Sequence, residues 1–408
     1  MNGWEVKKLS EVCQVDKSQG IHKNLPYVGM ENIESNTARF IGSTEPQSVK
    51  SASFSFTTKH LLYGRLRPYL NKVIAPEFEG HCSTELFPIK PSKCLDRNFL
   101  LYWFLMDSTV RLINATCTGA RMPRANMNTV LEFEFLLPPL SEQKRIVLIV
   151  DEAFEGIDRA IANTKKNRTN ARELFESYLN TILSGQGKQW KETTLGKEID
   201  LLTGFAFKSS GYTDSDKSIR LLRGDNIIPG SLRWDGVKRW QESKVNEYLR
   251  YQLQEGDVVL AMDRPWIKTG LRRAQISKDD LPCLLVQRTA CLRGGDNLEN
   301  RFLLYLISGR AFTQHVLGSQ TGLSVPHISG TQIQSFKFSK PSLREQYSII
   351  DSLDELKSET KRLEAIYQRK LAALKELKQS ILRKAFTGEL TADTTNQATK
   401  SVKEVIAA

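Results

Sequence analysis

The sequence predicts an α+β protein with an internal pseudo-two-fold repeat, in which two similar α/β domains are separated by two long antiparallel helices forming a coiled coil. Two stretches, 138–185 and 341–388, each begin with proline, carry a Glu-Gln pair and continue as a long apolar-periodic run to a glycine. The two stretches match at a constant offset of 203 residues, with Gln143 opposite Gln346. At 408 residues the chain is also too long for one ordinary hydrophobic core, so at least two domains are expected.

These observations divide the chain into five segments. Two similar α/β domains are expected over 1–137 and 186–340. Two helical spacers are expected over 138–185 and 341–390, and a small, polar, flexible tail over 391–408.

The two expected domains share a framework. In each, short apolar runs alternate with Gly, Pro and Asn, which is typical of strands joined by turns. Residues 98–114 are denser in apolar side chains and predict a single buried helix. Tyr102 in this stretch lies opposite Tyr305 at the same offset of 203, and Phe135 lies opposite Phe338. Between such anchors the halves diverge, so the interior loops differ while the framework is repeated.

The first spacer predicts a helix of about 43 residues, or roughly 65 Å at 1.5 Å per residue. Ser141 is the expected N-cap and Gly185 the expected C-terminal signal. Polar Thr164 and Asn167 interrupt the expected apolar stripe. The stripe positions, in steps of three and four, are Ile146, Val150, Ala153, Ile157, Ala160, Ala171, Leu174 and Tyr178.

The second spacer has a more continuous 3-4 seam of larger side chains. The seam positions are Ile349, Leu353, Leu356, Leu363, Tyr367, Leu374, Leu377 and Ile381. A single long helix cannot bury such a stripe alone, so we expect the two helices to pack on each other as an antiparallel coiled coil with the domains at opposite ends. The alternatives are that each helix packs on its own domain or on another subunit.

The charge balance indicates a polyanionic partner. The formal net charge is +12, which suits nucleic acid, although a solvated basic surface would give the same total. The six cysteines lack C-x-x-C spacing, so we expect free thiols in a reducing cytoplasm and no metal site. No signal peptide and no membrane span are expected.

No motif for catalysis is present in the sequence. It contains no G-x-x-x-x-G-K-[ST] loop for ATP, no G-x-G-x-x-G turn between a strand and a helix, and no recognisable nucleophile motif. We therefore expect a non-catalytic protein without catalytic residues.

Clusters of basic residues are the candidate DNA contacts, because arginine can grip guanine edges and lysine can neutralise phosphates. Ordinary solvated loops are the alternative explanation for each cluster. The candidates in the first half are Arg65, Arg67, Lys72, Arg121 and Arg124, and those in the second half are Lys208, Arg220, Arg223, Arg264, Lys268, Arg272 and Arg273. Arg67-Pro68 and Arg264-Pro265 match across the halves, since each follows a strand-like run.

Together these features resemble the specificity subunits of type I restriction-modification systems. The resemblance is carried by PPLSEQKRI and PSLREQYSI, by the near-200-residue duplication, by domain openings of the form W-x-x-x-x-L at Trp4 and Trp190, and by KAFTGEL at 384–390. It covers essentially the whole chain.

The resemblance implies a DNA-recognition subunit with no catalytic site. Each domain would read one half of a bipartite double-stranded DNA target, and the helices would set the half-site spacing and dock two methyltransferase subunits. The cofactors S-adenosylmethionine, ATP and Mg²⁺ would belong to partner subunits, which methylate adenine or, as restriction and motor subunits, translocate and cleave DNA. None would be held by this chain.

Three other functions remain open from the sequence. A fused restriction or methylation enzyme would need a catalytic motif. A coiled-coil scaffold that binds only protein would show no salt-dependent DNA binding. A stand-alone DNA-binding protein would bind its site tightly without partner subunits.

Overall fold

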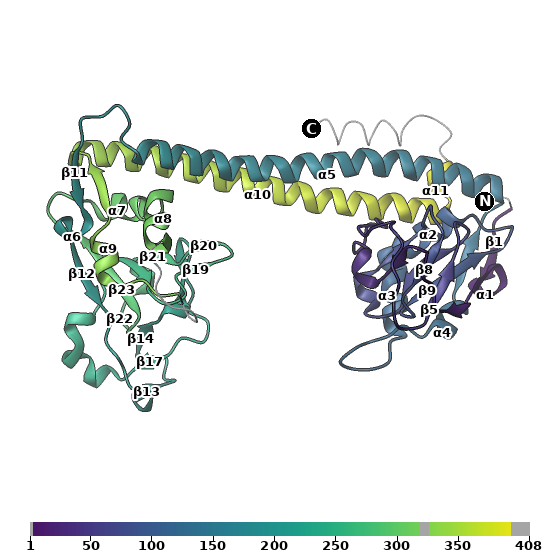
Figure 1. Ribbon diagram of the computed structural model, residues 1–408, viewed down its shortest axis with the longest axis horizontal. Coiled ribbons are helices and arrows are strands. Elements are labelled where there is room, and N and C mark those ends of the chain that lie inside the picture. The colour runs from purple at the N-terminus through teal and green to yellow at the C-terminus, as the bar shows by residue number, and fades with distance from the viewer. Residues whose placement is uncertain (1–2, 319–325, 393–408) are drawn as a thin grey trace. The chain divides into compact units, whose positions relative to one another are not determined.

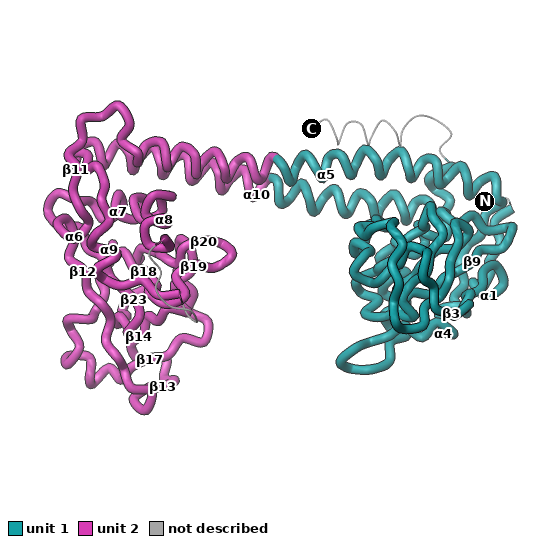
Figure 2. Tube along the Cα trace, in the orientation of Figure 1, with its two compact units in different colours: residues 1–166, 367–408 teal, residues 167–366 magenta. Residues whose placement is uncertain are grey.

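The computed structural model describes residues 3–318 and 326–392. The chain forms two compact units, residues 1–166 with 367–408 (unit 1) and residues 167–366 (unit 2), shown in Figure 2. The two expected long helices are present as α5 (Leu140–Leu183) and α10 (Leu343–Thr387), and each contributes one stretch to each unit. Together with mixed helix and strand in both units, this confirms the predicted fold class (Figure 1).

Unit 1 contains two four-stranded sheets and one two-stranded ribbon. The sheet orders are β2-β9-β6-β7 and β3-β5-β8-β4, and β1 pairs with β10. All pairings are antiparallel except that of β4 with β8. The strands are β1 Glu5–Lys8, β2 Cys13–Val15, β3 Gln19–Gly20, β4 Tyr27–Val28, β5 Ser53–Phe56, β6 Leu61–Gly64, β7 Val73–Ile74, β8 Gly80–Cys82, β9 Leu86–Pro91 and β10 Glu134–Leu137.

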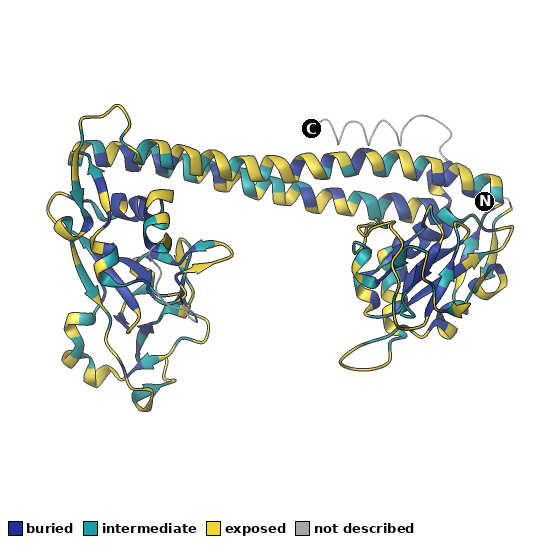
Figure 3. Ribbon diagram, in the orientation of Figure 1, coloured by how far each residue is buried: buried dark blue, intermediate teal, exposed yellow. Residues whose placement is uncertain are grey.

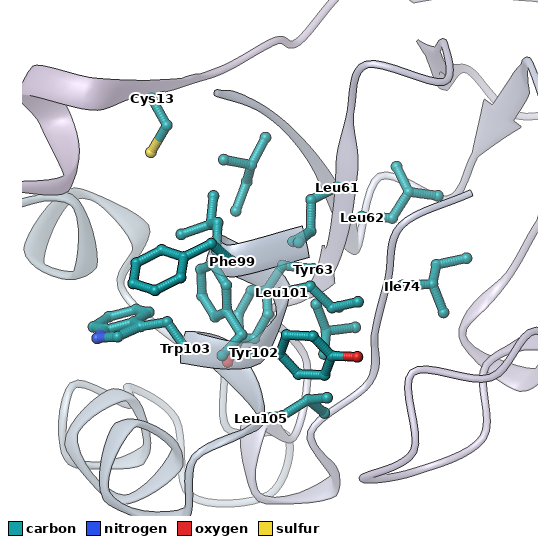
Figure 4. Close-up of a cluster of buried hydrophobic side chains, with 14 of the residues drawn as sticks. Cys13, Leu61, Leu62, Tyr63, Ile74, Phe99, Leu101, Tyr102, Trp103 and Leu105 are labelled. Atoms are coloured by element: carbon teal, nitrogen blue, oxygen red, sulfur yellow. The ribbon is translucent and has the colours of Figure 1, made fainter. Parts of the chain in front are cut away.

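Helices cover the sheets of unit 1 and close its core. They are α1 Leu9–Val12, α2 Arg97–Leu105, α3 Asp107–Ala115, α4 Met127–Leu131 and α11 Glu389–Ala392, with short 3₁₀ turns η1 Met30–Asn32 and η2 Pro68–Leu70. Tyr63 of β6 stacks on Phe104 of α2, with ring centroids 4.7 Å apart. Figure 4 shows this apolar cluster between β6 and α2, and Figure 3 shows that buried residues concentrate in the strands of each unit.

The stretch 98–114, expected as one helix, is two helices. Met106 is extended (φ −70°, ψ 131°) and separates α2 from α3. The side chain of Gln379 on α10 bridges the break, because it accepts from the Asp107 N–H (2.8 Å) and donates to the Leu105 carbonyl (3.0 Å). The prediction was wrong because a tertiary partner satisfies the backbone groups that a continuous helix would have paired internally.

Unit 2 repeats the first sheet and the two-stranded ribbon of unit 1, whereas the strand order of its second sheet differs. Its sheets have the orders β12-β23-β18-β21 and β13-β17-β14-β22, and β11 pairs with β24 as β1 does with β10. Again one pair, β14 with β22, is parallel. The strands are β11 Lys191–Thr194, β12 Ile199–Thr203, β13 Tyr212–Thr213, β14 Ile219–Leu222, β15 Ile227–Ile228, β16 Ser231–Leu232, β17 Arg239–Trp240, β18 Val258–Ala261, β19 Trp266–Ile267, β20 Gly270–Leu271, β21 Arg273–Gln275, β22 Cys283–Leu285, β23 Thr289–Gly294 and β24 Lys337–Lys340.

The helices of unit 2 also follow the repeat. They are α6 Leu195–Glu198, α7 Asn300–Leu306, α8 Arg310–Gly318 and α9 Gly330–Gln334, with 3₁₀ segments η3 Ser209–Gly211, η4 Gly224–Asn226, η5 Glu242–Tyr251 and η6 Lys278–Asp280. Phe302 and Tyr305 of α7 are buried against β18 and against Leu353 of α10. The backbone N–H of Arg310, the first residue of α8, donates to the side-chain oxygen of Asn180 on α5 (2.7 Å). In unit 1 the backbone N–H of Asp107, the first residue of α3, donates to the side-chain oxygen of Gln379 in the same way.

Within each unit, a stretch of α5 packs on a stretch of α10. In unit 1, Ile157 and Leu374 belong to one buried cluster, and Lys378 lies 2.7 Å from Asp158. In unit 2, Arg172 of α5 forms an ion pair with Glu364 of α10. Because early α5 meets late α10 and late α5 meets early α10, the helices run antiparallel, as predicted.

Two expected positions of the first seam are wrong. Leu174 and Tyr178 are 62% and 40% exposed, whereas Leu179 is buried and Phe175 is partly buried. Thr164 does not break the stripe, since it is buried with its hydroxyl donated to the Ala160 carbonyl (2.7 Å). The stripe follows the 3.6-residue period of a helix and drifts by one position toward the end of α5.

The start of each long helix also departs in part from expectation. Ser141 lies inside α5, which starts at Leu140. The equivalent of Pro139 in the second copy is Ser342, and this serine does cap its helix, exchanging hydrogen bonds with Glu345 (2.9 and 3.4 Å).

Buried contacts explain the glutamine of the repeated Glu-Gln pair. Gln143 accepts from the backbone N–H of Asp96, the N-cap of α2 (2.7 Å), and donates to the carbonyls of Cys94 and Pro138 (both 2.8 Å). Each glutamine therefore joins the start of a long helix to the start of a domain helix.

Gln346 repeats this network in unit 2. It accepts from the Glu299 N–H (2.9 Å) and donates to the carbonyls of Asn297 and Pro341 (both 3.0 Å). Both glutamines are fully buried.

The repeated aspartates have matched partners too. The Tyr102 hydroxyl donates to Asp151, and the Tyr305 hydroxyl donates to Asp354. The repeat offset thus marks residues that fasten α5 and α10 to the domains.

Part of the expected tail is ordered. Thr391 is buried in α11. The rest of that stretch, 393–408, lies outside the described residues. Among the helices that the structure describes, none is long and apolar enough to cross a membrane.

Candidate nucleic-acid interface

A strained turn occurs at the same place in each unit. Arg67-Pro68 follows β6, and Arg264-Pro265 follows β18. Both arginines have positive φ, 50° and 45°. This left-handed conformation is unfavourable for a residue with a Cβ, and proline restricts the preceding residue further. Strain of this kind persists only where the surrounding structure holds it, and it concentrates at functional sites.

A second loop holds each turn in place. The Arg67 N–H donates to the Pro123 carbonyl (2.7 Å), and the Arg264 N–H donates to the Pro326 carbonyl (2.9 Å). The two prolines are themselves equivalent at the offset of 203. The backbone of each arginine is therefore fixed.

In unit 1, Glu85 joins two candidate arginines beside this turn. Arg65 Nε lies 3.0 Å from a Glu85 oxygen, and Arg124 donates through Nε (3.0 Å) and Nη2 (2.8 Å). Arg65 also lies over the Phe87 ring, 5.0 Å from its centroid. Burial alone would raise the pKa of Glu85, but the hydrogen bonds and charges of Arg124 and Arg65 outweigh burial and lower it.

Unit 2 also has one carboxylate beside two basic side chains, but the acidic and basic residues stand at different sequence positions. Asp263 accepts from Arg288 Nη1 (2.7 Å) and lies 2.6 Å from His327 Nδ1. Arg288 occupies the position equivalent to Glu85, and His327 the position equivalent to Arg124. Each unit thus places one carboxylate and two basic side chains around its turn.

Two candidates are equivalent and bind the protein's own backbone. Lys72 Nζ donates to the Met30 carbonyl at 2.6 Å. Arg272 is buried and donates to the Gly224 carbonyl and, at 2.9 Å, to the Ile227 carbonyl. Met30 and Gly224 begin η1 and η4, so both cations fasten the same kind of 3₁₀ turn. Burial lowers the pKa of Arg272.

Two further candidates are engaged inside unit 2. Arg273 donates to the Ser308 hydroxyl (2.6 Å), and burial lowers the pKa of Arg273 to about 10. Arg220 donates to the Leu281 carbonyl (2.8 Å) and lies over the Trp234 ring, 4.9 Å from its centroid. These contacts position loops rather than leave the guanidinium groups free.

The remaining candidates lie at the surface. Arg223 pairs with Asp225 (3.2 Å). Across residues 3–318 and 326–392, no hydrogen bond or ion pair is found for the side chains of five exposed candidates, which are Arg67, Arg121, Lys208, Arg264 and Lys268. Arg67 and Arg264 are therefore both fixed in backbone and free in side chain.

Sequence reasoning missed the residues that organise the turns. Glu85, Asp263, Arg288 and His327 are not among the candidate DNA contacts predicted from the sequence. Aligning the halves at the offset of 203 would have placed Glu85 opposite Arg288 and Arg124 opposite His327. It would not have revealed the charge exchange, because Arg65 and Asp263 are not equivalent residues and meet their partners only in space.

Among the described residues, no group of three or more His, Cys, Asp or Glu side chains could hold a metal ion. The basic turns are suited to binding rather than to catalysis, since free guanidinium groups on a fixed backbone can donate to phosphates and base edges.

Comparison with known proteins agrees with this geometry. A family described as "Type I restriction modification DNA specificity domain" matches residues 1–170 and 188–372. The EcoAI specificity subunit of Escherichia coli is 38% identical over 168 residues, which are 41% of this chain and 28% of that subunit. The MjaVIII specificity subunit of Methanocaldococcus jannaschii is 23% identical over 311 residues, 73% of this chain and 71% of that protein.

Solved structures share the fold. A chain from a study of complex assembly and conformational transition in the type I R-M system has a TM-score of 0.77 at 21% identity, covering 95% of this chain and 98% of that one. The HsdS subunit from Thermoanaerobacter tengcongensis has a TM-score of 0.58 at 21% identity, covering 96% and 98%. Because the family match spans both halves of the repeat, the chain belongs to the family of type I restriction-modification DNA specificity domains.

Proposed function

We propose that this chain is the non-catalytic DNA-recognition subunit of a type I restriction-modification complex. The family match over both halves carries the proposal. The duplicated turns support it, because each unit presents one free arginine on a strained, fixed backbone. Each unit would read one half of a bipartite double-stranded DNA site.

The candidate residues divide into two roles under this proposal. Arg67, Arg121, Lys208, Arg264 and Lys268 would contact DNA directly. Lys72, Arg272 and Arg273 would position the reading loops, since their side chains already donate to the protein. Arg65, Arg124, Arg220 and Arg223 would act mainly in the same supporting way.

The long helices would set the distance between the half-sites and dock two methyltransferase subunits. The buried glutamines support the first role, because each fixes a helix rigidly to a domain. S-adenosylmethionine, ATP and Mg²⁺ would be bound by the methyltransferase and restriction subunits. The free cysteines fit assembly on DNA in a reducing cytoplasm.

Sequencing of methylated adenines in the host genome tests this function. We expect one bipartite motif that disappears when this chain is deleted. A continuous motif, or a bipartite motif that survives the deletion, would rule the proposal out.

A matched pair of substitutions assigns the half-sites. Arg67→Ala should relax or abolish methylation that depends on one half-site, and Arg264→Ala should affect the other. Equal loss of binding to unrelated DNA would identify both arginines as phosphate contacts. Lys93→Ala, at an exposed position in the turn after β9 of unit 1, serves as the charge-matched control.

A further inference from the structure

An exposed aromatic residue follows the Arg–Pro pair in both units. Tyr69 and Trp266 occupy equivalent positions, directly after Pro68 and Pro265. Tyr69 is 50% exposed and Trp266 is 47% exposed, whereas both prolines are buried. Large aromatic side chains usually contribute to a core or a contact surface, so their matched exposure requires an explanation.

The two rings remain equivalent although the surrounding backbone differs. In unit 1 the chain passes from Pro68 through the short turn η2 to β7. In unit 2 a longer connection forms the β19–β20 hairpin before β21. The loop thus differs in length between the units, but arginine, proline and an exposed ring follow one another in both. This indicates that these three residues carry the function of the loop.

We infer that Tyr69 and Trp266 are base-contacting residues, each packing its ring against the bases of its own DNA half-site. The inference rests on the proposed DNA-recognition function and adds a residue class that the basic clusters do not include. Each ring lies two residues after an arginine whose backbone is fixed and whose guanidinium is free. The arginine can neutralise phosphate or grip a base edge, while the ring can wedge into a base step and cover the base face that the wedge unstacks.

The rigidity of the turn favours this use. A base stack is gained only if the ring is already held in place, because ordering a mobile loop would offset the contact. The Arg67 carbonyl accepts from the Leu70 N–H (2.9 Å), and the Pro265 carbonyl accepts from the Arg272 N–H (2.7 Å), so the backbone closes on both sides of each ring. Ring and arginine are therefore presented as one unit.

A docking role for Trp266 is the competing explanation. Trp266 also lines a groove of about 880 Å³ within unit 2, together with Glu176 of α5 and Arg310 of α8. A partner protein could occupy that groove. Tyr69 has an equal exposure in unit 1, and the repeat therefore favours a ligand that both units share, which is DNA.

The test uses the full chain assembled with its methyltransferase subunits and duplexes carrying the bipartite site, with 2-aminopurine placed at successive positions of one half-site. Tyr69→Ala should weaken binding to its half-site by about ten-fold, since the cost of unstacking the duplex step offsets part of a base–aromatic stack. Tyr69→Phe should retain binding. Trp266→Ala and Trp266→Phe should behave in the same way at the other half-site.

The spectroscopic readout separates stacking from a merely structural effect. The 2-aminopurine signal should change on binding of the wild-type complex at one position in each half-site, and only the corresponding alanine variant should abolish that change. Val6→Ala shortens an apolar side chain on β1 that is 60% exposed and lies outside both the long helices and the turns, and it should leave both the binding and the signal unchanged.

Two results would overturn the inference while leaving the proposed function intact. One is full half-site binding by both alanine variants. The other is loss of methyltransferase association, rather than of DNA contact, in Trp266→Ala. If the wild-type complex binds no bipartite site at all, the proposed function itself fails.

Discussion

At the residue scale, two buried glutamines repeated in the two halves hold the long helices to the domains, although the residues around them differ between the halves. Gln143 and Gln346 make the same three hydrogen bonds, and two of the three partners differ in residue type between the units. Only backbone atoms are contacted, so the partners can change identity without loss of the bond. This explains how a glutamine repeats while the domains around it diverge.

Gln143→Ala should lower the free energy of unfolding by about 2–4 kcal/mol, because it removes the partner of the buried Pro138 carbonyl and of the part-buried Asp96 N–H and Cys94 carbonyl. Gln346→Ala should have a similar effect. Urea denaturation of the full chain measures both, with exposed Gln186→Ala as the control. A change below about 0.5 kcal/mol, the usual range of surface substitutions, would contradict the fastening role.

The pH dependence of Glu85 gives a second prediction at this scale. Because Arg124 and Arg65 depress its pKa, the paired carboxylate stabilises the fold fully above its unfolded pKa of about 4.3, and this contribution is lost as the pH falls through the lower folded pKa. Wild type should therefore be more stable than Glu85→Gln at pH 7, and the difference should shrink as the pH falls below about 4.3 and through the folded pKa.

Unfolding measured from pH 7 to pH 3 tests this expectation. Glu45→Gln, at an exposed position of the same unit, should differ little from wild type at every pH. A difference between wild type and Glu85→Gln that persists unchanged to pH 3 would show that the carboxylate is not the stabilising group.

At the element scale, the sequence predicted the helices well and their buried faces only in part. The second seam, from Ile349 to Ile381, is buried or half-buried at all the expected positions. The prediction of the first seam was wrong near its end. Leu174 and Tyr178 continue the 3-4 steps, but the buried face of α5 shifts by one position to Phe175 and Leu179. Small alanines early in α5 gave no signal to fix the phase.

A matched pair of leucines measures this difference. Leu374→Ala should destabilise the chain by about 2–5 kcal/mol, since Leu374 is buried in the helix pair of unit 1. Leu174→Ala should change stability by less than about 0.5 kcal/mol, since that side chain is largely exposed. Thermal unfolding of both variants is the measurement. Equal losses of stability would show that Leu174 is buried in the helix pair, as the sequence predicted.

The loops were beyond prediction for a different reason. Composition drew attention to Arg67 and Arg264 as candidates, but the positive φ of each accompanies a hydrogen bond to a proline far along the chain. Likewise, the sequence could not show that Lys72 and Arg272 donate to backbone carbonyls of the protein. A lysine or arginine that binds a carbonyl looks the same in the sequence as one that points into solvent.

At the scale of the whole molecule, duplication is the feature that the sequence conveyed best. Both units have the same order of strands in their first sheet, the same two-stranded ribbon, and the same glutamine and tyrosine–aspartate contacts to a long helix. Each unit is fastened to both α5 and α10. In our account, the helices therefore carry two independent readers and determine the distance between the DNA sequences they read.

The most direct test lengthens both helices together. Seven residues inserted after Lys166 in α5 and seven after Ile366 in α10 preserve the heptad phase and add about 10 Å to each helix. At 3.4 Å per base pair, methylated-adenine sequencing should then show the same two half-sites with a spacer about three base pairs longer. An unchanged spacer, or altered half-site sequences with the original spacing, would contradict the account.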